Sequence, residues 1–86
     1  MRYNVSLHAR QSLTERGISL AEVDEALQAP QQIVDNAVGG HCYQSIFPGA
    51  GGTMYLLRVM VDDTIDPAIV ITAYRTSRVD KYWRQS

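Results

Sequence analysis

The chain has 86 residues, of which 45% are hydrophobic and 20% are charged, and its formal net charge is −1. This length supports one domain, and the composition excludes a disordered tail. One cysteine, Cys42, excludes an intramolecular disulfide, and no apolar run is long enough to span a membrane. Because the N-terminus also lacks the apolar core of a signal peptide, these features favour a cytoplasmic protein.

Two helices are predicted in the first third of the chain. Residues 3–6 are either a short edge strand or the lead-in to the first helix. The first helix is expected over residues 7–16, and Gly17 stands where a left-handed residue ends it. The second helix begins with a capping box at Ser19 and ends before Pro30.

The rest of the chain is predicted to form a sheet joined by turns rich in glycine, proline and aspartate. The strands are expected at residues 31–35, 41–47, 54–62 and 68–75, and the turns at 37–40, 48–52 and 63–67. A last helical turn is expected after Ser77. We therefore predict an α+β fold for the single domain of residues 1–86, with two N-terminal helices packed on one face of a twisted antiparallel sheet of about four strands.

Side-chain alternation in the last two strands predicts which residues share a face. The rows expected to face the helices together are Tyr55, Leu57, Val59 and Val61 on one strand and Ile69, Ile71 and Ala73 on the other. This parity places Arg58, Thr72 and Tyr74 on the opposite face. A cation and two hydroxyls can each donate a hydrogen bond to an oxyanion, so the sequence indicates a phosphate site. The alternative is a solvated sheet face with one arginine.

The basic residues are concentrated at the two ends of the chain, and Arg58 is the only one between Gly17 and Ala73. If the ends meet, one face is positive and RNA or another polyanion is the expected partner, whereas scattered solvated charge is the alternative. Near the C-terminus, basic residues that attract phosphate alternate with aromatic rings that can stack on unpaired bases. The predicted nucleic-acid-binding residues are Arg10, Arg75, Arg78, Lys81, Tyr82 and Trp83. In the alternative interpretation, Tyr82 and Trp83 only cover the sheet edge.

The two histidines are weaker candidates. His8 is a possible acid or base near neutral pH, or else a packed helical residue. His41 follows a Gly-Gly turn and is predicted to be an exposed residue at the start of a strand. His8, His41 and Cys42 lack the paired spacing of a zinc site, so no metal is expected. No nucleotide-binding fingerprint is present, and no cofactor is expected either.

Several stretches together carry a family resemblance. They are Ser6-Leu7-His8-Ala9-Arg10, Arg16-Gly17-Ile18-Ser19, the acidic second helix ending at Pro30, Ile71-Thr72-Ala73-Tyr74-Arg75 and Lys81-Tyr82-Trp83. The chain resembles the bacterial domain of unknown function 4258 family, which is grouped loosely with the BrnT and RelE/ParE toxins of toxin–antitoxin pairs. The resemblance implies a RelE/BrnT-like domain and a metal-free ribonuclease controlled by a small antitoxin. By position, it implies catalytic roles for His8, Arg16, Arg58, Thr72 and Tyr74.

In the implied reaction, the ribose hydroxyl attacks the adjacent phosphate, a general base takes its proton, and an acid protonates the leaving oxygen. His8 or Tyr74 is expected to transfer protons, and Arg58 to stabilise the developing charge. The rival hypothesis is a non-catalytic interaction module that docks an acidic protein or nucleic acid through its cationic edge. Self-association is a further expectation, because so short a chain buries a small core.

Overall fold

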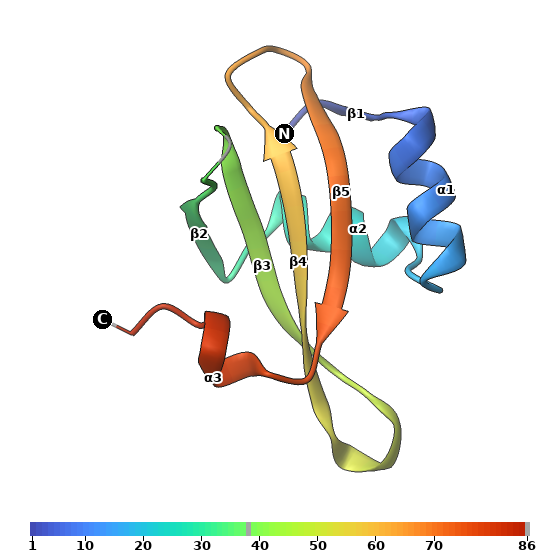
Figure 1. The fold of residues 1–86 in the computed structure, drawn as a ribbon, viewed down its shortest axis with the longest axis vertical. Helices are drawn as coiled ribbons and strands as arrows, with labels where there is room; N and C mark the ends of the chain where they lie inside the picture. The colour runs from blue at the N-terminus through green and yellow to red at the C-terminus, as the bar shows by residue number, and fades with distance from the viewer. Residues whose placement is uncertain (38, 86) are drawn as a thin grey trace.

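The computed structural model describes residues 1–37 and 39–85, and it shows one sheet with helices on both sides (Figure 1). In chain order, the elements are β1 (Tyr3–Val5), α1 (Leu7–Glu15), α2 (Leu20–Gln28), β2 (Gln32–Asp35), β3 (His41–Pro48), the 3-10 turn η1 (Ala50–Gly52), β4 (Met54–Asp62), β5 (Ala68–Thr76) and α3 (Val79–Tyr82). Val38, in the predicted turn at 37–40, lies outside the described residues. None of the helices in the described part of the chain is long and apolar enough to cross a membrane.

The two N-terminal helices begin where the sequence predicts. The hydroxyl of Ser6 accepts a hydrogen bond from the backbone N–H of Ala9 and caps α1. Ser19 and Glu22 form the predicted capping box at the start of α2. Gly17, which follows α1, has a φ of 66°, a value that costs glycine little. Both helix predictions are therefore confirmed.

The sheet has five strands in the order β1-β5-β4-β3-β2, one more than expected. The additional strand is β1, which pairs in parallel with residues 68–70 of β5, and every other pairing is antiparallel. Three residues are too few to show a strand period, and their partners lie more than 60 positions away in the sequence. Residues 3–5 therefore form a short edge strand, and they are not merely the lead-in to the first helix.

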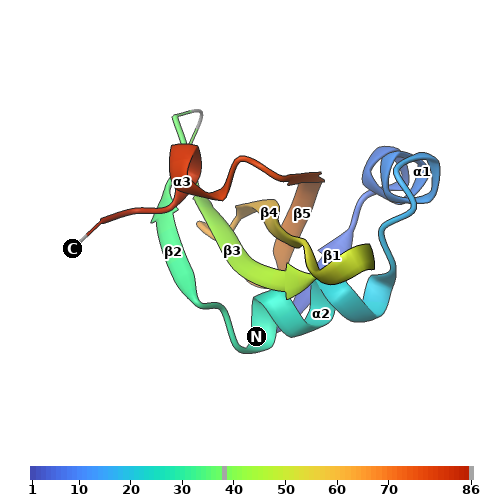
Figure 2. The same cartoon turned by 90° about the horizontal axis from the view of Figure 1, so that it is seen from below.

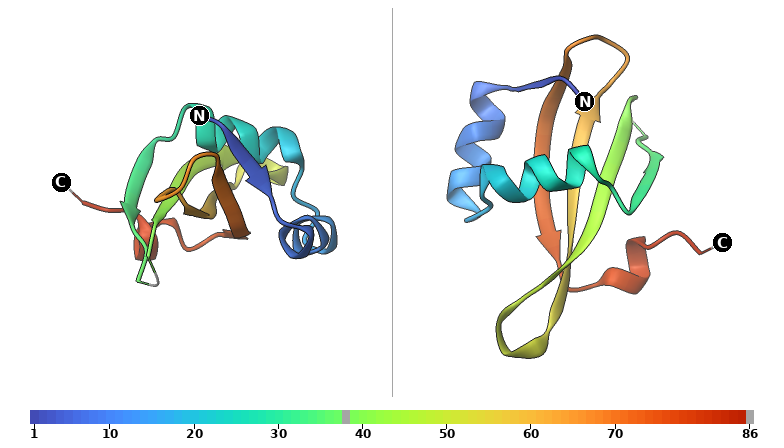
Figure 3. Two further views of the ribbon diagram at one scale, coloured as in Figure 1. Left: turned by 90° about the horizontal axis from the view of Figure 1, so that it is seen from above. Right: turned by 180° about the vertical axis from the view of Figure 1, so that it is seen from behind.

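The N-terminal helices cover one face of the sheet, as predicted, and α3 lies on the other side. Seen from behind, α2 runs across the strands (Figure 3), and the view from below places α2 and α3 on opposite sides (Figure 2). The core lies between the sheet and α1 and α2, and it includes Leu13, Val23, Leu27, Leu57, Val59, Val61, Val70 and Ala73. The opposite face, which we call the open face, is more polar and carries the candidate site.

The pairing of β4 with β5 confirms part of the predicted register. Arg58 lies opposite Tyr74, and Met60 lies opposite Thr72. Side chains on directly paired residues point to the same face. Arg58, Thr72 and Tyr74 therefore share the open face, as the alternation in the sequence predicts.

A β-bulge changes the register beyond Met60. Val61 pairs with Val70 rather than with Ile71, so Ile71 is the extra residue. The extra residue reverses the alternation beyond it. Val70 is therefore fully buried in the core, and Ile71 is 41% exposed. The prediction that Ile69 and Ile71 would face the helices is wrong for this reason.

Candidate functional site

The candidate site is centred on Arg58, a half-buried residue of β4. Its Nε donates a hydrogen bond to Gln44 Oε1 on β3 (2.9 Å), and its Nη1 donates one to the Tyr74 hydroxyl on β5 (2.6 Å). The Tyr82 ring of α3 lies over the guanidinium, with its centroid 4.4 Å from Cζ. Three adjacent strands and a helix thus hold this cation in one orientation.

Within the described residues, the charge of Arg58 has no acidic partner. Among residues 1–37 and 39–85, no carboxylate lies within ion-pair distance of its guanidinium. Only two of its five N–H groups donate to an oxygen of these residues. Burial raises the pKa of the neighbouring Cys42 thiol, which keeps it neutral, although Arg58 opposes that rise. The positive charge is therefore available to a ligand.

A second arginine approaches the same face from the end of α1. Arg16 Nη1 donates to Thr72 Oγ1 (3.2 Å) and to the Ala73 carbonyl (2.6 Å). Thr72 and Tyr74 lie two residues apart on one strand, a separation of about 6.7 Å. Each hydroxyl accepts a hydrogen bond from an arginine, so its own proton is left to donate elsewhere.

Four of the five predicted catalytic residues therefore lie together. They are Arg16, Arg58, Thr72 and Tyr74, which we call the arginine–hydroxyl row. The fifth, His8, is exposed in the first turn of α1. In the part of the chain that the structure describes, the His8 side chain forms no hydrogen bond or ion pair with the row.

Tyr82 has a role that the sequence did not indicate. It was predicted to stack on bases, but its ring lies against Arg58 and has the Lys81 ammonium 5.2 Å from its centroid. Its ring also meets the Tyr74 ring edge-on. Lys81 is the main cause of a lowered pKa for the Tyr82 phenol, with Tyr74 and Arg58 adding to the effect. A lowered pKa means that the Tyr82 phenol gives up its proton more readily than an ordinary tyrosine does.

The other predicted nucleic-acid-binding residues are spread over three elements. Arg75, on β5, donates from Nη2 to the Arg16 carbonyl (2.7 Å) and lies over the Tyr55 ring, so the two ends of the chain meet here. It also lines a hollow of about 290 Å³ beside the glycine-rich turn after β3. Arg10 is exposed on α1, whereas Arg78, Lys81 and Trp83 lie in or beside α3.

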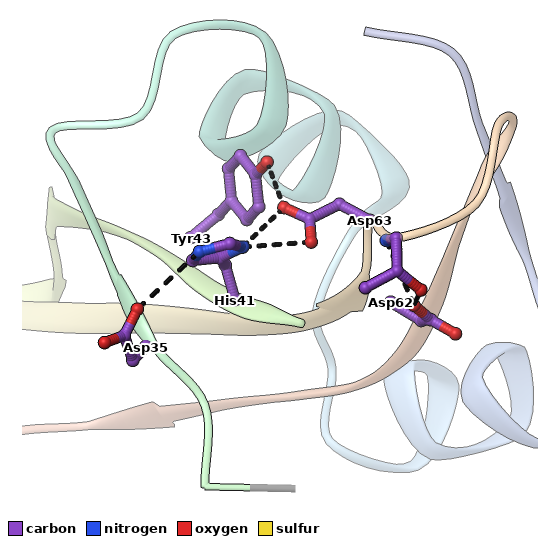
Figure 4. A network of polar contacts seen from close by, with 6 residues as sticks. Asp35, His41, Tyr43, Asp62 and Asp63 are labelled. Carbon is purple, nitrogen blue, oxygen red and sulfur yellow. Dashed lines mark hydrogen bonds and ion pairs between the residues drawn. The ribbon is translucent and has the colours of Figure 1, made fainter. Parts of the chain in front are cut away.

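A second polar network lies where β3 begins (Figure 4). His41 Nδ1 lies 2.8 and 2.9 Å from the carboxylate oxygens of Asp63, which also accepts a hydrogen bond from the Tyr43 hydroxyl (2.8 Å). The other ring nitrogen of His41, Nε2, lies 3.6 Å from Asp35 Oδ1. The hydrogen bond with Asp63 is the main cause that raises the pKa of His41.

The sequence did not indicate the His41 network, because Asp63 lies 22 positions from His41 and only the β3–β4 pairing brings them together. His41 is 43% exposed at its side chain, which agrees in part with the predicted exposed position. Across the described ranges, no group of three or more histidine, cysteine, aspartate or glutamate side chains is arranged to hold a metal ion.

Comparison with known proteins identifies the family. The sequence model described as "Domain of unknown function (DUF4258)" matches residues 5–75. The chain belongs to the DUF4258 family. No curated protein and no solved structure matches it. The DUF4258 match includes the whole arginine–hydroxyl row and Gln44, whereas Lys81 and Tyr82 of α3 lie beyond its end.

Proposed function

We propose that this DUF4258 domain is a cytoplasmic, toxin-like, RNA-directed protein of a toxin–antitoxin pair. The arginine–hydroxyl row binds a phosphodiester of RNA and promotes its cleavage without a metal ion. The observation that carries this proposal is the half-buried Arg58 guanidinium, which is held by neutral groups and keeps its charge for a ligand.

The row offers the donors that a phosphodiester requires. The guanidinium of Arg58 has N–H groups in its plane that donate to no oxygen of the described residues, and Tyr82 covers one flat side of the group. The Tyr74 and Thr72 hydroxyls can donate beside it. Partial burial strengthens the attraction between a guanidinium and a phosphate, since water screens it less. Strands also hold these donors more precisely than loops would.

The reaction is a transfer within the RNA strand. The ribose 2′-hydroxyl attacks the adjacent phosphorus and loses its proton to water. Arg58 stabilises the charge that develops on the phosphate oxygens. Tyr74 protonates the leaving 5′-oxygen, so the products are a 2′,3′-cyclic phosphate and a 5′-hydroxyl. His8 takes no part in this step, because it is exposed in the first turn of α1 and, among the described residues, forms no hydrogen bond or ion pair with the row.

The second candidate function is a non-catalytic interaction module that binds RNA or an acidic protein. One observation favours it: within the described ranges, neither a histidine nor a carboxylate contacts Arg58. These are the side chains that most often act as a general base. The two functions differ in whether bound RNA is cut.

The test is induced expression, with growth and RNA integrity followed over time. We expect the wild-type chain to slow growth and to shorten RNA, and a small protein encoded beside it to reverse both effects. Arg58→Ala should lower the cleavage rate by about 10²–10³, which is typical for the loss of one charge-stabilising group. Arg2→Ala is the matched control, because Arg2 is an exposed arginine whose ion-pair partner is Asp66.

Thermal melts of both variants show whether a loss of activity reflects unfolding. Full activity in a folded Arg58→Ala protein would contradict the proposed role of Arg58. A wild-type chain that binds RNA and leaves it intact would establish the interaction module instead.

A further inference from the structure

Gln44 is a polar residue with 0% exposure, at the centre of the open face. Its Oε1 accepts the hydrogen bond from Arg58 Nε, and its Nε2 donates to Gln32 Oε1 (2.8 Å) and to the Tyr82 carbonyl (3.3 Å). Because arginine can only donate, the Gln44 amide has one workable orientation, with its oxygen toward Arg58. Any group that holds the other end of this amide therefore also constrains Arg58.

The groups at that other end attach the C-terminal segment to β2. Gln32 Oε1 accepts a hydrogen bond from the Arg84 backbone N–H (3.0 Å), and Gln32 Nε2 donates to the Arg84 carbonyl (2.8 Å). The Arg84 side chain in turn donates to the Ile33 carbonyl (3.3 Å). The backbone of the segment is thus held by two glutamine side chains, Gln32 at Arg84 and Gln44 at Tyr82.

We propose that residues 79–84 form a latch that positions Arg58 for its ligand, with Gln44 as the connecting residue. This inference rests on the proposed function in taking Arg58 as the oxyanion-binding group. Hydrogen bonds run without interruption from Arg84 through Gln32 and Gln44 to Arg58. The Tyr82 ring, also part of the latch, lies on the guanidinium itself. The bonds around Gln44 are partly buried, where linked hydrogen bonds strengthen one another, whereas those between Gln32 and Arg84 are exposed.

The latch lies beyond residues 5–75, which the family model matches, whereas Arg58, Tyr74 and Gln44 lie within them. The site therefore has two parts. Residues 5–75 supply Arg58 and the Tyr74 hydroxyl beside it. The latch supplies the ring that covers one side of the cation and the carbonyl that holds the Gln44 amide. Gln44 is a positioning residue, since it acts on the ligand only through Arg58.

Gln32→Ala tests the latch in the full-length protein without changing any group that touches Arg58. It removes the hydrogen bonds that Gln32 makes with Gln44 and with both backbone groups of Arg84. We expect the Arg58 Nε–H to exchange with water about three- to tenfold faster, as measured by NMR, since a network bond of ordinary strength is lost. Affinity for a labelled single-stranded RNA should fall by a similar factor.

The matched control is Gln31→Ala. Gln31 also makes two side-chain hydrogen bonds across to β3, with the backbone of Ile46, but it does not contact Gln44 or Arg84. Its loss should leave both the Arg58 exchange rate and RNA affinity unchanged. If both variants speed the exchange and weaken RNA binding equally, the cause is a general loosening of β2. That result would overturn the latch.

A second variant, Gln44→Glu, places a carboxylate against Arg58 with little change in shape. It should neutralise Arg58 and lower the slope of log affinity against log salt by about 0.7, the value for one lost phosphate contact on a single strand. Gln11→Glu, on the exposed side of α1, makes the same charge change away from the site. An equal slope change in both variants would overturn the role of Gln44.

The Arg58 Nε–H exchange rate tests the latch, and RNA binding tests the proposed function, so either can fail without the other. An unchanged Arg58 Nε–H exchange rate in Gln32→Ala overturns the latch, whether or not RNA binds. Faster exchange in Gln32→Ala alone, in a chain that does not bind RNA, supports the latch and contradicts the RNA-directed function.

Discussion

Arg58 and His41 are the centres of two polar networks on neighbouring strands, and they differ in how their charge is balanced. His41 faces two carboxylates, those of Asp63 and Asp35, and its imidazolium charge is compensated within the protein. Arg58 faces an amide and two phenols, none of which carries a compensating charge in its neutral form. A compensated cation stabilises the fold, whereas an uncompensated one that is held in place can bind an anion.

The positions of the two networks agree with this distinction. The His41 network joins the start of β3 to the turn after β4, so it holds two connections together at one end of the sheet (Figure 4). The Arg58 network lies on the open face and includes a helix from outside the matched family region. We therefore expect changes to the first network to affect stability and changes to the second to affect RNA binding.

The largest effect on stability should come from Asp63→Ala. This change leaves the Tyr43 hydroxyl and the His41 ring without their acceptor, which should cost about 1–3 kcal/mol in the free energy of unfolding. Asp66→Ala is the matched control, because the pair of Asp66 with Arg2 is exposed and is worth about 0–1 kcal/mol. Urea unfolding measures both. At a temperature where Asp63→Ala is folded, it should bind RNA as tightly as the wild type does. Weaker RNA binding by folded Asp63→Ala would contradict the distinction between the two networks.

A smaller effect should appear as a dependence of stability on pH. The pKa of His41 is raised in the folded protein, so its contribution to stability is fully present below the unfolded pKa, about 6.5, and is lost as pH rises through the folded value. Burial opposes ionisation of Asp63, but hydrogen bonds from His41 and Tyr43 outweigh it and lower its pKa. The contribution from Asp63 is therefore lost only as pH falls into the acid range.

Melting temperatures of the wild type and His41→Gln between pH 5 and pH 9 test this dependence. The wild type should be the more stable protein at the acidic end of this range, and the difference should shrink as pH rises. His8→Gln is the control, because His8 is exposed and forms no hydrogen bond or ion pair in residues 1–37 and 39–85. A difference between wild type and His41→Gln that grows with pH would contradict the assignment of the His41 network.

The sequence predicted the elements that depend on local signals. The caps at Ser6 and Ser19 have side chains that bond to nearby backbone, and such signals lie within four residues. The parallel pairing of β1 and the bulge at Ile71 depend on contacts between distant segments, which no short pattern records. One extra residue in β5 was enough to exchange the exposures of Val70 and Ile71.

The same limit applies to the candidate site. Alternation along β4 and β5 predicted that Arg58, Thr72 and Tyr74 would share a face, because the bulge lies beyond them. The positions of Gln44 and Tyr82 could not be predicted, since they depend on how β3 and α3 meet the open face. Nothing in the sequence distinguishes Gln44 from the exposed glutamines of the chain.

The most direct test of the uncompensated charge is the binding of a labelled single-stranded RNA by wild type and Arg58→Gln across a range of salt concentrations. The substitution removes one charge while keeping a polar side chain of moderate length. We predict weaker binding and a slope of log affinity against log salt that is lower by about 0.7. Arg2→Gln should match the wild type in both respects. If Arg58→Gln binds with the same affinity and the same salt dependence as the wild type, Arg58 does not contact RNA, and the open face is not the binding site.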